Sequence, residues 1–244
     1  MNPARTFATA GRVLAQLRHD PRSIALMILA PVLLTGLFAW MFDGTPVFQQ
    51  IGPVVLAIFP FIIMFVITSV TTLRERRGGT LERLLTTPLG KGDFIAGYAL
   101  AFAVMAAVQA IVVSAFAVWV CGLDVEGPVW LLLVVGIVGA VGGMAMGLFA
   151  SAFAATEFQA VQFLPVLVFP QLLLGGVFIA RDAMPDVLRV IGDWLPLSHA
   201  IDAIQAVATE SEPGWDVGWP LLKLGAWALA FLVLGGLTLR RRTA

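Results

Sequence analysis

Apolar runs long enough to cross a bilayer recur six times along the chain. A helix needs about 20 apolar residues to cross a hydrocarbon core about 30 Å thick, because each residue rises only about 1.5 Å. The runs cover residues 23–42, 51–73, 94–123, 127–156, 158–180 and 220–239. They are apolar on every face, whereas a strand of a membrane barrel alternates over about ten residues. The pattern therefore predicts an all-α integral membrane protein with six transmembrane helices.

Two further segments are too short or too polar to span. In residues 1–22, apolar and arginine positions alternate at helical spacing. This favours an amphipathic helix at the inner membrane interface, and a frayed basic tail is the alternative. Residues 181–219 predict an external helical hairpin, interrupted at Trp194 and Pro196, with Ser198 as the cap of its second helix. The hairpin either lies at the outer interface or dips back as a re-entrant pair.

The loop of residues 74–91 carries a pattern of its own. Gly78 and Gly79 break the preceding helix, and Thr80 can cap a new one. Glu82 then lies in the first turn, where the helix dipole favours an acid, and Pro88 ends the helix. Its short apolar face consists of Leu81, Leu84 and Leu85. The bilayer surface, the protein's own helices or a cytosolic partner must cover these leucines.

Small residues and prolines lie inside the spans. Gly139, Gly143 and Gly147 recur at four-residue intervals, which lets another helix approach closely, either within the chain or at a subunit interface. Each internal proline removes one backbone hydrogen bond, so a neighbour must satisfy the freed carbonyl. These prolines produce packing kinks or hinges, and they are Pro31, Pro60, Pro165 and Pro170.

The charges are few and unevenly placed. The chain of 244 residues is 59% hydrophobic and 12% charged, with no net charge, which excludes a globally basic nucleic-acid binder. Six crossings place twelve of the fifteen basic residues on one side: Arg5, Arg12, Arg18, Arg22, Arg74, Arg76, Arg77, Arg83, Lys91, Arg240, Arg241 and Arg242. The positive-inside rule assigns that side, with both termini, to the cytoplasm.

The residues that catalysis or metal binding would need are missing from the sequence. One cysteine, Cys121, and two histidines, His19 and His199, provide neither a disulfide framework nor a Cys/His metal site. No phosphate-binding G-x-x-x-x-G-K-[ST] loop occurs, and the span centres hold no acid or base. We therefore expect no catalytic or metal-binding residues, and any transport must draw its energy from elsewhere.

The loop sequence resembles a known family signature. Residues 74–88 read R-E-R-R-G-G-T-L-E-R-L-L-T-T-P, similar to the R-E-R-x-x-G-T-L-E-x-L-x-x-T-P signature of ABC-2 type exporter permeases of the daunorubicin-resistance-like branch. The resemblance covers nearly the whole chain, as one ABC-2 type transmembrane domain over residues 1–244. Residues 195–203 look like the family's N-P-L-T-Y-x-x-x-A pattern, but Leu195 replaces Asn and His199 replaces Tyr, so no role is transferred there.

The resemblance implies a permease that works beside a second copy or a homologue, with ABC ATPase subunits that hold ATP and Mg²⁺. This chain itself would bind no cofactor. The loop becomes a coupling helix on the ATPase, with charges such as Glu75 at its rim; the coupling residues are Arg74, Glu75, Arg76, Gly79, Thr80, Leu81, Glu82, Arg83, Leu84, Leu85 and Pro88. The second and fifth spans become the substrate path, lined by Phe59, Phe61, Phe65, Gln162, Phe163, Phe169, Gln171 and Phe178.

The expected function is export of an amphipathic or hydrophobic compound, such as a drug, an antibiotic or a lipid, across the bacterial cytoplasmic membrane. Two alternatives stay open: a polysaccharide or glycolipid exporter permease, and a membrane scaffold or immunity protein that does not transport. The expected partners are the ATPase, the second permease and membrane lipid, with no nucleic acid.

Overall fold

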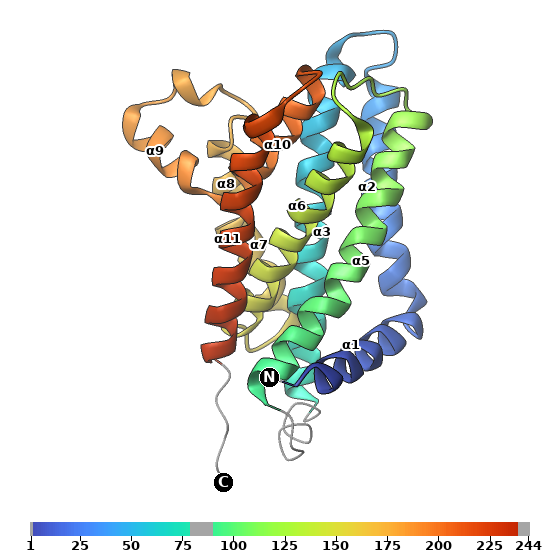
Figure 1. The fold of residues 1–244 in the computed structure, drawn as a ribbon, viewed down its shortest axis with the longest axis vertical. Helices are drawn as coiled ribbons and strands as arrows, with labels where there is room; N and C mark the ends of the chain where they lie inside the picture. The colour runs from blue at the N-terminus through green and yellow to red at the C-terminus, as the bar shows by residue number, and fades with distance from the viewer. Residues whose placement is uncertain (1, 79–89, 239–244) are drawn as a thin grey trace.

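The computed structural model describes residues 2–78 and 90–238, and within these ranges every regular element is a helix (Figure 1). The helices are α1 (Pro3–Arg18), α2 (Pro21–Met41), α3 (Val47–Arg77), α5 (Lys91–Trp119), α6 (Val129–Ser151), α7 (Glu157–Leu167), α8 (Phe169–Leu174), a 3₁₀ turn (Arg181–Ala183), α9 (Asp186–Trp194), α10 (Pro196–Thr209) and α11 (Gly214–Thr238). Six segments have the length and composition of a span: α2, α3, α5, α6, the α7–α8 pair and α11. The predicted all-α, six-span fold is confirmed.

The fifth span differs from the continuous helix predicted over residues 158–180. It is divided at Val168 into α7 and α8, and the helix ends at Leu174. Pro170 lacks the N–H that would continue the ladder, and Gly176 has a positive φ of 86°, which ends the segment. The prediction is therefore wrong for residues 175–180, which are not helical.

Other boundaries shift by a few residues. The third span ends at Trp119 instead of residue 123, since Gly122 turns the chain with a φ of 69°. The fourth ends at Ser151 instead of residue 156, and Thr156 caps α7 through the Gln159 N–H at 3.1 Å. The last begins at Gly214 instead of residue 220. Ser198 is not the cap of α10, which begins at Pro196, a residue suited to the first helical turn.

The centre of the bundle is the contact between α3 and α6. About two thirds of each span window is buried, 61% for α3 and 67% for α6, against 17% for α2, α7–α8 and α11. A Cβ at Gly143 or Gly147 would lie within 3.0 Å of the α3 backbone, whereas one at Gly139 would meet only the Ala200 Cβ at 3.7 Å. The two backbones touch within one chain, so Gly143 and Gly147 serve the packing of α6 against α3 inside the bundle.

A buried glutamine offsets the proline inside α2. Pro31 cannot donate to the carbonyl of Met27, four residues earlier. The Gln109 side chain of α5 is fully buried and donates its Nε2–H to that carbonyl at 2.7 Å. This bond explains an amide in the middle of an apolar span.

Helix α1 lies across one end of the bundle, where the end of α11 also lies (Figure 1). Its buried face, which includes Thr9, Val13 and Leu17, packs mainly on α5. The Asn2 backbone N–H also donates to Asp93 of α5 at 2.7 Å. We call this the basic end; α10, mostly buried against α3, α6 and α11, lies at the opposite end. The amphipathic N-terminal helix is thus present, with its apolar face against protein.

Candidate functional site

The last turn of α3 contacts three different helices through three consecutive side chains. Arg74 donates from Nε and Nη2 to the two carboxylate oxygens of Glu157 on α7, both at 2.8 Å. Arg76 donates to the carbonyl of Ser151, at the end of α6, at 2.7 Å. Glu75 points the other way, to α1. The end of α3, just before the family-like loop, therefore binds α1, α6 and α7 at the basic end.

Glu75 belongs to a small polar cluster beneath α1. Its Oε1 accepts from Gln16 Nε2 at 2.8 Å, and its Oε2 lies 3.6 Å from Arg12. Arg12 in turn donates to the Tyr98 hydroxyl of α5 at 2.8 Å and lies over the ring. Because the Glu75 side chain is only 11% exposed, it faces the protein interior. The charge has partners on α1 within the chain, and the role of Glu75 at a docking rim stays a prediction.

The predicted coupling helix itself is not covered by the structure. Helix α3 ends at Arg77, and the Gly78 N–H closes its last turn on the Arg74 carbonyl at 2.8 Å. The break predicted at Gly78 is confirmed. Gly79, Thr80, Leu81, Glu82, Arg83, Leu84, Leu85 and Pro88 lie outside the described residues.

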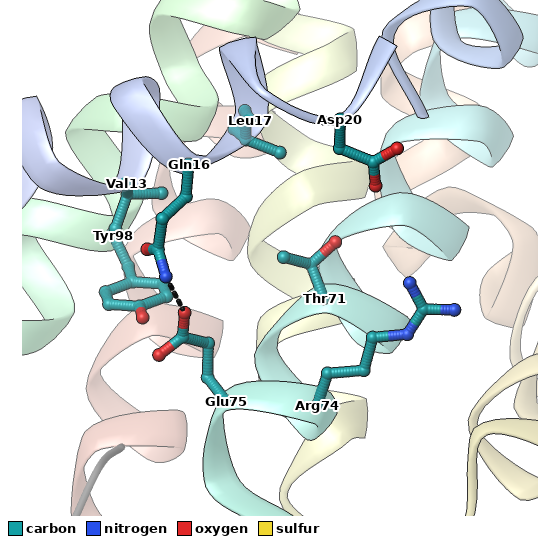
Figure 2. Close-up of a pocket in the computed structure, with 8 residues that line it drawn as sticks. All are labelled: Val13, Gln16, Leu17, Asp20, Thr71, Arg74, Glu75 and Tyr98. Carbon is teal, nitrogen blue, oxygen red and sulfur yellow. Dashed lines mark hydrogen bonds between the residues drawn. The ribbon is translucent and has the colours of Figure 1, made fainter. Parts of the chain in front are cut away.

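A pocket of about 230 Å³ opens beside the same turn of α3 (Figure 2). Its walls come from α1, the α1–α2 junction, α3 and α5, through Val13, Gln16, Leu17, Asp20, Thr71, Arg74, Glu75 and Tyr98. Asp20 caps α2, accepting from the Ser23 N–H at 3.2 Å and the Ser23 hydroxyl at 2.7 Å. These bonds hold the pKa of Asp20 below its usual value, so the pocket carries a carboxylate at neutral pH.

The residues expected to line a substrate path are not gathered on one surface. Phe61 and Phe65 have no exposed surface and pack against the glycines of α6, so neither can line a path at the edge of the chain. Phe59 and Phe163 are partly buried, the former edge-on to Phe38. Exposed positions are Gln162, Phe169 and Phe178.

Gln171 has structural partners. Its Nε2–H donates to the Leu167 carbonyl at 2.6 Å, where α7 ends. Its Oε1 accepts from the Leu197 N–H at 3.1 Å, in the first turn of α10. The side chain is 4% exposed. Gln171 thus joins the broken span to α10, and its place in a path is not supported.

The titratable groups at the opposite end lie in or near α10. Arg181 pairs with Asp202 and lies 3.4 Å from Asp193. Burial, with help from the charges of Lys223 and Arg181, lowers the pKa of His199 to about 4. Burial also raises the pKa of Asp202, against the effect of Arg181. Among the residues that the structure covers, no group of three or more His, Cys, Asp or Glu side chains could hold a metal ion.

Several residues of the basic-end cluster were not singled out as site residues from the sequence, among them Gln16, Tyr98 and Glu157. Each had a weak signal. Tyr98 is the only tyrosine and lies in an apolar run, and Glu157 is the only charge between the fourth and fifth runs. A lone polar residue beside a long apolar run generally has a polar partner, but its identity depends on the fold.

Comparison with known proteins agrees with this architecture. The family model for the ABC-2 type transporter matches residues 5–208, so the chain belongs to the ABC-2 type transporter family. The probable multidrug ABC transporter permease YbhR of Escherichia coli K12 is 28% identical over 178 residues, which are 71% of this chain and 48% of YbhR. The daunorubicin resistance ABC transporter permease protein DrrB1 of Streptomyces coeruleorubidus is 25% identical over 238 residues, 88% of this chain and 81% of DrrB1.

The inner membrane transport permease YhhJ of Escherichia coli K12 is 25% identical over 191 residues, which are 77% of this chain and 51% of YhhJ. The chain therefore spans about half the length of YbhR and YhhJ. Family and fold together make it a multi-pass protein of the bacterial inner membrane, in a family whose permease component is not itself the ATPase.

Proposed function

We propose that the chain is the permease subunit of an ATP-binding cassette exporter that moves an amphipathic or hydrophobic compound, such as a drug, an antibiotic or a lipid. A separate ATPase subunit holds ATP and Mg²⁺, and a second copy or a homologue completes the permease pair. The family, and relatives named for multidrug and daunorubicin resistance, support this proposal.

The observation that carries the proposal is the last turn of α3. Residues 74, 75 and 76 bind α7, α1 and α6, and Arg12 extends the cluster to α5. A force applied to the loop that follows reaches α1, α6 and α7 through direct hydrogen bonds, and α5 indirectly through Arg12. This arrangement suits a loop that receives an ATPase stroke better than one that only reverses the chain.

The substrate path is proposed on the exposed face of α7 and the segment after it. Gln162, Phe169 and Phe178 are accessible there, and a second permease against this face would enclose them. Phe61, Phe65 and Gln171 are left out, because they are buried within one chain.

The orientation is tested by labelling. With Cys121 replaced, a single cysteine at Asp216, in the exposed first turn of α11, is expected to react with an impermeant reagent on intact cells. A single cysteine at Arg77, at the basic end, is expected to react only after lysis. The reverse pattern would place the basic end outside and remove the coupling assignment.

The docking step is tested with Leu84→Asp, which places an unpaired charge on the predicted apolar face of the loop. If an ATPase covers that face, the variant inserts and folds but loses the ATPase on co-purification, at a cost of about 2–5 kcal/mol in binding. A variant that folds, keeps its ATPase and transports normally would show that the leucines rest on something else. Failure to find any ATPase that binds the wild type would favour the scaffold alternative.

The transmission step is tested with Glu75→Gln, which keeps the hydrogen-bonding shape but removes the charge that faces Arg12. We expect the ATPase to bind normally while compound-stimulated hydrolysis falls severalfold. The matched control is Glu212→Gln, an exposed acid at the opposite end, which is expected to change neither. Loss of stimulation in both variants would contradict a specific role for the α3 cluster.

A further inference from the structure

A polar pocket and an apolar groove lie next to each other on one side of the bundle and share Leu17. The pocket is the 230 Å³ hollow that holds Asp20 and Arg74. The groove is lined by Leu17, Ser23, Ile24, Met27, Ile67, Phe102 and Met105, from the α1–α2 junction, α2, α3 and α5. Ile67 lies one helical turn from Thr71 of the pocket, and Phe102 one turn from Tyr98, so each pair shares a helix face. The groove is shallow, with no enclosed room for a water molecule, so the pocket and the groove form a surface strip that runs along α2 and α3 away from the basic end.

The pocket presents both signs of charge to the same space. Figure 2 shows the Asp20 carboxylate, the Thr71 hydroxyl and the Arg74 guanidinium directed toward one another across the opening. Asp20 accepts two bonds from Ser23, and a carboxylate has about four acceptor positions. Arg74 uses Nε and Nη2 for Glu157, which leaves the two N–H groups of Nη1 for another acceptor.

These features define an amphiphile with a positive and a negative group in its head. We propose that the strip binds one bilayer phospholipid whose headgroup carries a primary ammonium, the chemistry of an ethanolamine headgroup. The ammonium donates to Asp20, the phosphate accepts from Arg74 Nη1, and an acyl chain lies over the partly exposed side chains of Ile24 and Ile67. The site lies within one chain. It is separate from the exposed α7 face that is assigned to the substrate path.

Charge complementarity selects this headgroup over the other common ones. A headgroup with only negative charge would pair with Arg74 but leave the Asp20 carboxylate facing a second negative charge. A choline headgroup has the positive charge, but its methyl groups cannot donate hydrogen bonds to a carboxylate. A primary ammonium offers the acid three N–H donors for charge-assisted hydrogen bonds, and such bonds are the stronger kind.

The first experiment uses the full-length wild-type protein in nanodiscs or detergent with defined lipids. Thermal unfolding is followed against added phosphatidylethanolamine, its N,N-dimethyl form, phosphatidylcholine and phosphatidylglycerol. We expect the midpoint concentration for stabilisation to rise stepwise as N–H groups are replaced, to roughly tenfold for choline. Equal stabilisation by ethanolamine and choline lipids would overturn the proposal. Tighter binding of the glycerol lipid would do so too, by assigning lipid contact to the arginines of α1.

The second experiment uses Asp20→Asn, chosen because an asparagine side chain still caps a helix while carrying no charge. Bound lipid that survives purification is quantified by mass spectrometry. We expect the ethanolamine lipid retained per protein to fall severalfold in Asp20→Asn. The matched control is Asp43→Asn, an exposed acid just beyond the other end of α2, which is expected to retain the wild-type amount.

Two further results would overturn the proposal. One is equal retention of the ethanolamine lipid in Asp20→Asn and the wild type. The other is a pocket that binds a transported amine-bearing amphiphile but gains no stability from any ethanolamine lipid, which would assign it to cargo.

Discussion

The two ends of the bundle are both joined by polar side chains, but these differ in their exposure to solvent. At the opposite end, Gln171 and His199 are each only 4% exposed. At the basic end, Arg74 and Glu157 form a bidentate pair with side chains 56% and 49% exposed. A buried polar bond is costly to break, because the freed group loses its partner without gaining water.

An exposed ion pair contributes little to stability and can exchange its partner for solvent. The comparison therefore gives the opposite end a fixed geometry and the basic end an adjustable one. That is the distribution expected if an ATPase acts on the loop after α3, as proposed above. The Glu75 side chain is 11% exposed, which lies between these two cases. It would keep the cluster together while the exposed pair exchanges its partners.

The largest effect on stability is expected at the contact between α3 and α6, in the centre of the bundle. Gly143→Ala places a Cβ within 3.0 Å of the Phe61 backbone, so α3 and α6 must separate. We expect the free energy of unfolding to fall by about 3 kcal/mol, measured by denaturation in detergent. Gly139→Ala is the control on the same stripe, with its nearest neighbour at 3.7 Å, and is expected to be neutral or slightly stabilising. Equal losses in both variants would mean that the helices do not meet as described.

A smaller but clear loss is expected for the buried amide at the opposite end. Gln171→Leu leaves the Leu167 carbonyl and the Leu197 N–H without their partner. We expect a loss of about 2 kcal/mol in unfolding free energy. Gln162→Leu, at an exposed position of the same span, should leave stability unchanged. If the two substitutions behaved alike, burial would not be what distinguishes the two ends.

The opposite end should also respond to acid through His199. Its pKa is lowered to about 4 in the folded chain, against about 6.5 when unfolded. The folded state therefore binds this proton less readily, so stability falls as the pH drops below about 6.5 and stops falling near the folded pKa. Between pH 7 and pH 5 the loss is about 2 kcal/mol.

The pH prediction is checked by melting curves of the wild type and of His199→Gln, whose loss over this interval should be flatter. Asp202, with a raised pKa, acts in the opposite direction, and it is present in both proteins. A wild-type profile that matches the variant would mean that His199 is accessible to protons in the folded chain.

The smallest effect on stability is expected at the exposed pair of the basic end. Glu157→Gln should lower the unfolding free energy by less than about 0.5 kcal/mol, and added salt should reduce the difference further. Compound-stimulated ATPase activity is expected to fall despite this small cost. A stability loss as large as that of Gln171→Leu would remove the distinction between a fixed end and an adjustable one.

Much of the architecture followed from local features of the sequence. The number of spans, the amphipathic helix before them and the break at Gly78 depend on apolar length, helical spacing and glycine, which act over a few residues. The family-like loop was recognisable for the same reason. The errors occurred where two local signals compete. In the fifth run the apolar length predicts a continuous helix, but Pro170 and Gly176 interrupt it.

The partner of each polar side chain was decided only by the tertiary structure. Gln109 and Gln171 both lie in apolar spans, yet one binds a carbonyl freed by Pro31 and the other joins α7 to α10. Phe61 and Phe65 looked like path residues in sequence and are at the centre of the bundle. The physical reason is that a span apolar on every side has no stripe to mark its inner face. Lipid and protein interior are equally apolar, so only the packing of the other helices decides which residues are buried.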